Sequence, residues 1–308
     1  MALDQVDVDE IVEVKVEKEM SFFEHLEALR WHIIRALIAV ASIATFVFFQ
    51  KDFVFKTIVF GPRNPDFYTY RLFCSFGEMM CIQPTRFEVI TRDLAEKFTT
   101  HISVSIILGL IVAFPYVFWE FWRFIKPGLY PNERKSARGV VLICSLLFIM
   151  GVLFGYYFIA PFALSFLAGY ELADTLATPT LNSYINYMVM FTLPVGLIFE
   201  MPVVSFFLTK AGVLAPQMLR SGRRYAIVII LIVAAVLTPS PDVVSQMILA
   251  TPLYILFELS IAVSARVWNA KQKIILAEEA ELLMREKALL ERNIEDITDS
   301  TQTVEYVK

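Results

Sequence analysis

Charged residues are scarce in this sequence. Asp, Glu, Lys and Arg account for 19% of the 308 residues, whereas hydrophobic residues account for 57%. A soluble domain is about 25% charged, and the charges here gather mainly at the two ends of the chain and in loops. The deficit excludes two ordinary soluble domains, which the length alone would allow. It predicts an all-α integral membrane protein with the lipid bilayer as its main surroundings.

Histidine and cysteine are also rare, with three of each. His25 and His32 have no Cys or second His at ligand spacing, so we expect no metal site. Cys144 lies in an apolar run, where a small core residue is expected. Cys74 and Cys81 bracket CSFGEMMC in a polar loop, a spacing that fits no common zinc pattern. We expect them to form a disulfide if the loop faces an oxidising compartment.

Motifs of catalysis are missing from the chain. It has no Gly-rich phosphate loop, no HExxH, no nucleophile elbow and no paired intramembrane aspartates. We therefore expect no enzymatic activity and no cofactor, and we expect no nucleic-acid partner. The N-terminal stretch MALDQVDVDEIVEVKVEKEM is acidic and has no apolar core, so no cleavable signal peptide is expected.

Six apolar segments predict six transmembrane helices. A helix needs about 20 residues to cross a hydrocarbon core of about 30 Å. The first four segments reach that length, some only with their flanks, but the fifth has 13 residues and would rise only about 20 Å. The last two spans are therefore expected to be short, forming a tight hairpin that crosses with local thinning of the bilayer. The segments are 33–49, 98–122, 139–167, 184–208, 225–237 and 243–263.

The loops predict the orientation. Loop 123–138 carries five Lys/Arg and loop 210–224 carries four, whereas loop 168–182 and the turn TPSPD carry none. This alternation predicts that both termini lie in the cytoplasm. Loop 51–97 would then lie outside; it has seven Lys/Arg but also six acids, and it is rich in Phe, Tyr and proline. We expect it to form an ordered extracytoplasmic cap, with Pro62 as a structural residue.

These features divide the chain into three parts. A polar tail (1–20) precedes a six-span membrane domain (21–266), and a charged amphipathic tail (267–308) follows. In the C-terminal tail Leu or Ile recurs every seven residues from Leu276 to Ile297. Two or three heptads are too few to indicate a coiled coil. The spacing favours a solvated helix that rests on its own protein or on the membrane.

The stretch SFFEHLEALRWHII predicts a helix start. Ser21 and Glu24 have the spacing of a capping box, so a helix is expected to begin before the first span. Glu24, Glu27 and Arg30 lie near one face of that helix. The spacing alone favours a Glu27–Arg30 ion pair over an acidic docking face at the cytoplasmic surface.

Two carboxylates lie inside apolar runs, Glu200 in GLIFEMPVV and Glu258 in LYILFELSI. An acid at the bilayer centre costs about 2.5–3.5 kcal/mol, and such residues face an interior, a wet cavity or a partner. Depth favours a functional role for Glu200, whereas Glu258 lies nearer a span end, where snorkelling is an equal alternative. Thr238, Asp242 and Gln246 cluster at the outer end of the short hairpin, either as capping groups or as a polar docking site.

Five stretches together are similar to one known family. The chain resembles the TatC family, the six-span core subunit of the twin-arginine protein translocase, over about residues 21–266. The stretches are HLEALR (25–30), FPYVFWEFWRFIKPGLYPNERK (114–135), FGYYFIAPFALSFL (154–167), GLIFEMPVV (196–204) and LTPSPDVVSQMILATPLYILFEL (237–259).

The resemblance implies a function and a set of partners. It implies a receptor that binds folded precursor proteins through signal peptides with two consecutive arginines. It also implies an oligomeric complex with TatA- and TatB-type single-span subunits, located in the bacterial cytoplasmic (inner) membrane and driven by the proton-motive force. The family's functional residues map by motif onto Phe124 and Glu133 (signal-peptide contact), Glu200 (intramembrane acid), Pro115 (a proline of the second span), and Thr238, Gln246 and, between them, Asp242 (partner docking). Pro127 is expected to be a structural residue of loop 123–138.

Two departures from the family pattern concern the site. The family's HLxELR reads HLEALR here, so Ala28 stands in place of an acid, and Glu27 or Glu24 is the candidate substitute. The family's TPPD reads TPSPD, with one added residue. A guanidinium binds a carboxylate through a planar fork, so a receptor for two arginines needs surface carboxylates, which Glu133 and Glu27 would supply. Phe124 would border a groove for the apolar part of the signal peptide.

Two other functions compete with this one. A proton-coupled small-solute secondary transporter would use Glu200, but it predicts inverted repeats and broken helices at mid-membrane, and no repeat is visible in the sequence. A purely structural membrane anchor would leave Glu200, and an acid in a basic loop, without a role.

Overall fold

The computed structural model describes residues 22–75, 87–125, 137–170, 178–237 and 243–305. This part of the chain is helical, and its one β-bridge pairs Ile90 with Thr180. The helices are α1 (Phe22–Phe49), α2 (Lys51–Phe53), the π-helix η1 (Val54–Val59), the 3-10 helix η2 (Gly61–Arg63), α3 (Tyr68–Ser75), α4 (Glu96–Ile125), α5 (Ala137–Phe154), the π-helix η6 (Gly155–Ile159), α6 (Ala160–Gly169), α7 (Leu181–Ile198), α8 (Met201–Lys210), α9 (Pro216–Ser221), α10 (Arg223–Leu237) and α11 (Val243–Glu305).

The apolar segments of the sequence are helices, as predicted. Five helical stretches are long and apolar enough to cross a membrane, at 26–49, 96–124, 139–169, 181–210 and 249–291. They contain the first four predicted spans and most of the sixth. The predicted fifth span is α10, which has 15 residues and rises about 22 Å. The all-helical membrane fold is thus confirmed, and α10 is as short as the sequence indicated.

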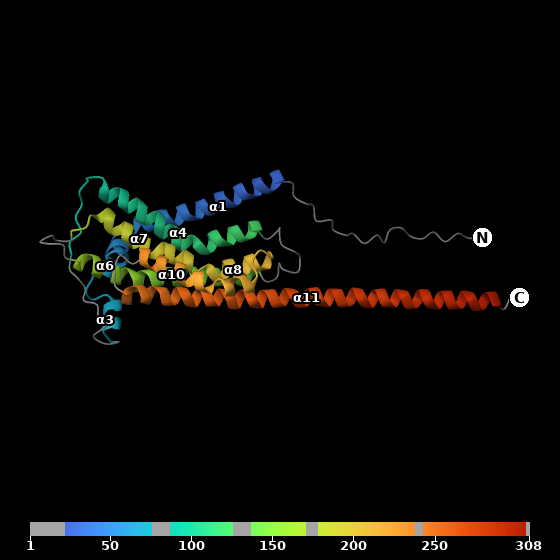
Figure 1. Cartoon of the computed structure of the whole chain (residues 1–308). Helices are drawn as coiled ribbons and strands as arrows, with labels where there is room; N and C mark the ends of the chain where they lie inside the picture. Colours follow the sequence, from blue (N-terminus) through green and yellow to red (C-terminus); the bar gives the residue numbers. More distant parts are fainter. Residues whose placement is uncertain (1–21, 76–86, 126–136, 171–177, 238–242, 306–308) are drawn as a thin grey trace.

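The helices pack side by side along one axis (Figure 1). The N-terminal helix α1 packs on α4, α5 packs on α7, and α8 and α10 pack on α11. We call the end of the bundle where α1 begins and α4 ends the basic end, and the opposite end, with η1, η2 and α3, the cap end (Figure 1). The end of α8, the helix α9 and the start of α10 also lie at the basic end (Figure 1), and they carry Lys210, Arg220, Arg223 and Arg224.

Proline accompanies a local irregularity in two of the crossings. Pro161 lies in the first turn of α6, directly after the π-helix η6, and Pro202 lies in the first turn of α8. Proline lacks a backbone N–H, and at Pro202 the helix starts anew, so that group would have no partner within it. The helical run continues through Pro161, and Thr69 donates to the carbonyl of Tyr157, four residues before this proline, at 2.6 Å. The break between α7 and α8 leaves Glu200 as the residue that precedes α8. An acid thereby occupies a helix junction within an apolar crossing.

The cap end is folded against the bundle. Tyr184 of α7 donates to the carbonyl of Val59 at 2.8 Å, and Tyr156 of η6 donates to the carbonyl of Ile58 at 2.6 Å. Within the cap, Tyr70 donates to the carbonyl of Pro62 at 2.8 Å, and burial raises the pKa of this phenol above its usual value. The phenols are neutral donors, and they satisfy carbonyls that the irregular turns of η1 and η2 leave free.

Glu96 joins the cap end to the start of α7. Its buried carboxylate accepts the backbone N–H of Arg92 at 2.7 Å on Oε2 and that of Asn182 at 2.8 Å on Oε1. The bridge between Ile90 and Thr180 runs beside it. One side chain thus holds the loop before α4 against the first turn of α7.

We expect Glu96→Gln to weaken the cap. A glutamine amide offers one acceptor oxygen, so one of the two backbone N–H groups loses its partner, which costs about 1–3 kcal/mol. Thermal unfolding in detergent measures the loss. Glu88→Gln is the matched control, because Glu88 is exposed in the same segment and such substitutions stay within about 0.5 kcal/mol. Equal midpoints for the two variants would show that the Glu96 contacts contribute nothing.

The last helix runs far beyond the bundle. Helix α11 has 63 residues, about 95 Å at 1.5 Å per residue, and its C-terminal part projects past the basic end (Figure 1). Inside the bundle, Ser264 and Thr209 of α8 form a buried hydrogen bond of 2.7 Å. Residues 271–291 are exposed throughout. The described part of the C-terminal tail is helical and continues the sixth span without a break, and its residues 271–291 do not pack on the rest of the described protein.

Candidate functional site

A buried carboxylate lies near the basic end of α4. The side chain of Glu120 is 1% exposed, five residues before the helix ends. Two neighbours come from α4 itself: Tyr116, one turn earlier, donates to Oε1 at 3.0 Å, and a guanidinium nitrogen of Arg123, one turn later, lies 3.6 Å from the same oxygen. The spacing of i−4 and i+3 places these side chains on one face of α4.

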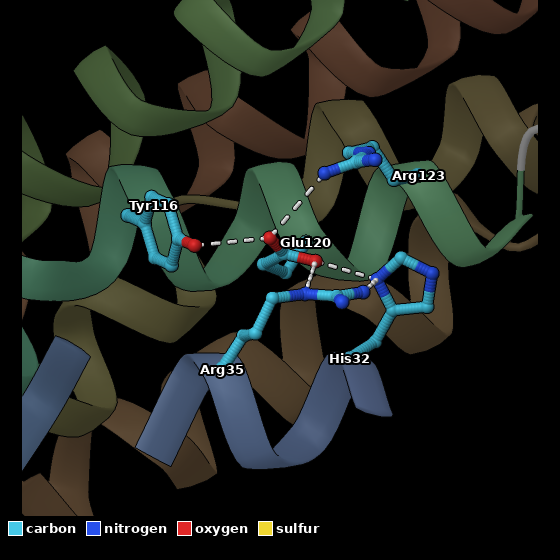
Figure 2. Close-up of polar contacts among 5 residues, drawn as sticks. All are labelled: His32, Arg35, Tyr116, Glu120 and Arg123. Carbon is cyan, nitrogen blue, oxygen red and sulfur yellow. Dashed lines mark hydrogen bonds and ion pairs between the residues drawn. The ribbon is translucent and has the colours of Figure 1, made fainter. Parts of the chain in front are cut away.

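Helix α1 supplies the other half of this cluster (Figure 2). His32 Nδ1 lies 2.5 Å from Glu120 Oε2, and Arg35 Nε donates to the same oxygen at 3.3 Å. His32 and Arg35 are three residues apart on α1, and an Arg35 guanidinium nitrogen lies 3.1 Å from His32 Nδ1. The side chain of His32 is 15% exposed, whereas that of Arg35 is 41% exposed. We call Glu120, Tyr116, Arg123, His32 and Arg35 the Glu120 cluster.

The Glu120 carboxylate is saturated. Each of its two oxygens faces two polar groups, which matches the roughly four lone-pair sites of a carboxylate. A buried carboxylate is tolerated only when it is paired and hydrogen-bonded, and here it joins α1 and α4 into a single unit. Glu120 is therefore buried among its own cations and is not accessible to an additional one.

Phe124, the first predicted site residue, lies beside this cluster. Its ring is edge-on to that of His32 with centroids 6.2 Å apart, and Phe124 is partly buried. The guanidinium of Arg123 stacks over the Trp119 ring at 4.8 Å. The end of α4 is thus fixed against α1 by both ring and charge contacts, which places Phe124 at the contact of the two helices.

The predicted acids of α1 lie toward its start. Glu24 and Glu27 are exposed, and Ala28 is partly buried. The expected ion pair between Glu27 and Arg30 does not form, although both side chains are in the described part of the chain. Glu133, together with the structural Pro127, lies outside the described residues, so its contact with the signal peptide stays a prediction.

Glu200 faces the protein interior. It is 8% exposed, and its Oε2 accepts a hydrogen bond of 2.7 Å from the buried thiol of Cys144 on α5. Its Oε1 is buried and has no hydrogen-bond partner among the described residues. An acid in an apolar crossing was expected to face an interior, a cavity or a partner, and the first of these arrangements is the one observed. Its functional role stays a prediction.

Glu258 lies in an ion pair. Its side chain is 33% exposed, accepts from Arg223 of α10 at 2.8 Å, and accepts from Tyr254 one turn earlier at 3.0 Å. Glu258 therefore has the same kinds of partner as Glu120, a tyrosine one turn earlier and an arginine from a neighbouring helix, but it is more exposed. The pairing with Arg223 gives Glu258 a structural reason to lie at this depth.

The other predicted residues are spread over the fold. Gln246 donates its amide to the carbonyl of Leu231 at 3.0 Å and so ties α11 to α10, while Thr238 and Asp242 lie outside the described residues. Pro115 lies inside α4, and Pro62 is buried in η2. Cys74 is exposed in α3 and is disulfide-bonded, but Cys81 lies outside the described residues, so the Cys74–Cys81 pairing stays a prediction.

An apolar cavity of about 440 Å³ lies toward the cap end. Side chains of η1, α4, η6 and α7 line it, among them Val104, Tyr156 and Met188. Phe124 is not among its lining residues. The groove expected beside Phe124 is therefore a different place from this cavity.

Glu120 and its partners were not predicted from the sequence. The sequence did contain a signal for Glu120, because it is an acid in an apolar run. The same criterion singles out Glu200. The aromatic stretch YVFWEFW obscures it, and no local spacing pairs it with His32. In the described part of the chain no three His, Cys, Asp or Glu side chains gather as metal ligands would. The cluster is built for ion pairing.

Comparison with known proteins finds one family throughout. The family model described as Sec-independent protein translocase protein (TatC) matches residues 24–252. A protein of that name from Blattabacterium sp. subsp. Periplaneta americana is 36% identical over 263 residues, covering 82% of this chain and 98% of its own length. A protein with the same description from Aquifex aeolicus is 34% identical over 257 residues, covering 83% of this chain and 99% of its own length. A crystal structure of the twin arginine translocase receptor TatC superposes with a TM-score of 0.59 at 34% identity, covering 79% of this chain and 99% of that one.

Proposed function

This chain belongs to the TatC family of Sec-independent protein translocase proteins, and from that premise we propose that it is a receptor for twin-arginine signal peptides. In this role it binds folded precursor proteins at the cytoplasmic face and serves as the core subunit of the translocase. TatA- and TatB-type single-span subunits join it, and the proton-motive force drives export. Similarity to a structure described as the twin arginine translocase receptor supports this role.

The orientation in the membrane follows from charge. The basic end carries the Lys/Arg-rich turns, and the positive-inside rule assigns such turns to the cytoplasm. We therefore propose that the basic end, both termini and the projecting part of α11 lie in the cytoplasm of a bacterium, with the protein in its inner membrane. The cap end and the α10–α11 turn then lie outside, where Thr238, Asp242 and Gln246 would receive a partner helix.

One observation carries the receptor proposal: α1 packs on α4 so that His32 contacts Phe124, and α1 carries exposed acids nearer its start. The His32 ring contacts Phe124 at a centroid distance of 6.2 Å, and Glu27 precedes His32 by five residues, about 7.5 Å along the helix. Glu27 is exposed and makes no ion pair with Arg30, so its carboxylate is open to a guanidinium. Glu120 is 1% exposed and already paired with two arginines, so Glu27 or Glu24 is the substitute that we propose for the acid missing at Ala28.

Photo-crosslinking tests the proposal. With a crosslinker placed at Phe124 or Glu27, we expect strong crosslinks to a precursor with an Arg-Arg signal and at least about tenfold weaker ones to its Lys-Lys counterpart, because lysine lacks the planar fork. A crosslinker at Ile274, exposed on the projecting part of α11, serves as the position control. Equal crosslinking of both precursors at Phe124 would refute the receptor role.

Charge removal from the two proposed carboxylates separates their contributions. Glu27→Gln and Glu133→Gln keep the side-chain volume and remove the charge-assisted bond, so each is expected to weaken precursor binding by about tenfold. The transporter alternative, in contrast, predicts loss of activity only on substitution of Glu200. The hydrogen bond from Cys144 occupies one oxygen of Glu200, and the family match does not favour that alternative.

A further inference from the structure

We propose that Arg35 and Arg123, oriented by Glu120, form a binding site for the phosphate headgroup of an anionic phospholipid. The two guanidinium groups come from neighbouring helices and meet at one buried carboxylate (Figure 2). The site adjoins the proposed precursor site, since Phe124 contacts His32, but it takes a ligand of the opposite charge.

The charges of the cluster do not balance. One carboxylate faces two permanently charged guanidinium groups, so the Glu120 cluster carries a surplus positive charge even when His32 is neutral. Among the described residues no second carboxylate contacts either arginine. On α1 itself, Glu27 precedes Arg35 by eight residues, about 12 Å. The surplus calls for an anion within the cluster.

Both guanidinium groups keep unused hydrogen-bond donors and are half-exposed. A guanidinium has five N–H donors, and the contacts of Arg35 and Arg123 with Glu120 and His32 use only a few of them. Their side chains are 41% and 48% exposed, whereas Glu120 is 1% exposed. Arginine forks match phosphate oxygens, and basic pockets between transmembrane helices bind anionic headgroups. Glu120 thus positions donors for a ligand that it does not itself touch.

The depth of the cluster is that of lipid headgroups. Trp and Tyr concentrate where the hydrocarbon core meets water. Tyr116 of the cluster is 38% exposed, Trp119 beside Arg123 is 40% exposed, and Trp31, next to His32 in the sequence, is 52% exposed. About one turn deeper in the apolar crossings, Ile38 and Val112 are 59% and 60% exposed. A lipid with its phosphate on the arginines would therefore lay its acyl chains on apolar side chains, which a free phosphate ion cannot do.

The test uses the full chain, purified in neutral detergent and titrated with phosphatidylglycerol, phosphatidylcholine or inorganic phosphate. Native mass spectrometry counts bound lipid. We expect phosphatidylglycerol to be retained and phosphatidylcholine not, and we expect Arg35→Gln/Arg123→Gln to weaken retention about tenfold. Arg224→Gln is the matched control, because the guanidinium of Arg224 also stacks on an aromatic ring, that of Tyr225 at 4.9 Å. The Arg224→Gln variant should retain phosphatidylglycerol like the unchanged protein.

Three results would overturn the site: equal retention of both lipids, wild-type retention by the double variant, or displacement of phosphatidylglycerol by inorganic phosphate alone at matched concentration. If the double variant does not fold, Arg123→Gln alone replaces it. Arg123 lies 3.6 Å from Glu120, beyond hydrogen-bond distance, so it adds little to the pairing of α1 with α4. We expect this single variant to retain phosphatidylglycerol at a level between those of the unchanged protein and the double variant. The crosslinking of precursors in detergent is independent of this result, so the two proposals can fail separately.

Discussion

Gly155→Ala is expected to destabilise the bundle more than any other single-methyl change at its described glycines. A Cβ at Gly155 would lie 2.3 Å from the carbonyl oxygen of Phe191 and 2.8 Å from Cα of Thr192, both backbone atoms of α7. Overpacking costs about 1–3 kcal/mol where side chains can shift, and backbone cannot shift without moving the helix. The gain in helix propensity from Gly to Ala is about 1 kcal/mol, so the clash, at the upper end of that range, dominates and we expect a net loss of about 2 kcal/mol.

The same helical run supplies the control. Gly139, near the start of α5, has no atom within 4 Å of the point where an added methyl group would lie, so Gly139→Ala is expected to be neutral or to stabilise by up to about 1 kcal/mol. Thermal unfolding of both variants in the same detergent makes the comparison. Small residues such as Gly155 let membrane helices approach closely. Equal unfolding midpoints for the two variants would show that α5, η6 and α7 are not packed as tightly as described.

The helices themselves were predictable because apolar length is a local property. Each apolar run of the sequence is a helix, and the 15 residues of α10 agree with the short fifth span. The sequence did not indicate that α11 is continuous, because the residues after Val263 change from apolar to charged. The stretch SARVWNAKQKII contains no Gly or Pro, so nothing in it ends a helix. The change in composition predicted where the helix leaves the membrane. That boundary is not the residue at which the helix ends.

The site was predictable only in part, because its contacts join distant parts of the chain. Glu200 stands out as an acid in an apolar run, but its partner Cys144 lies 56 residues away, in a run that indicates only a core residue. His32 and Glu120 are 88 residues apart. Local spacing brings Tyr116 and Arg123 to Glu120, whereas only the packing of α1 on α4 adds the histidine and the second arginine. Helix pairing of this kind leaves no periodic signal in either segment.

The second large effect is expected at Glu120. Glu120→Ala removes the acceptor for Tyr116 and Arg35 and leaves His32, at 15% exposed, with no carboxylate. Removing one partner of a fully buried ion pair costs about 3–5 kcal/mol. Here the two arginines are half-exposed and can turn to water, so we expect about 1–3 kcal/mol, the range for lost hydrogen bonds to charged groups.

Glu258 provides a test of whether burial, and not chemistry, sets this cost. Glu258→Ala removes the same kinds of partner, a tyrosine one turn earlier and an arginine from a neighbouring helix. Its side chain is 33% exposed against 1% for Glu120, so water replaces the lost bonds and we expect a cost below about 1 kcal/mol. At about 2–4 °C per kcal/mol for a chain of this size, thermal unfolding separates the two variants. If Glu258→Ala lowered the midpoint as much as Glu120→Ala, the carboxylate of Glu120 would be only one more interfacial ion pair, and the joining of α1 to α4 would rest on their apolar contacts alone.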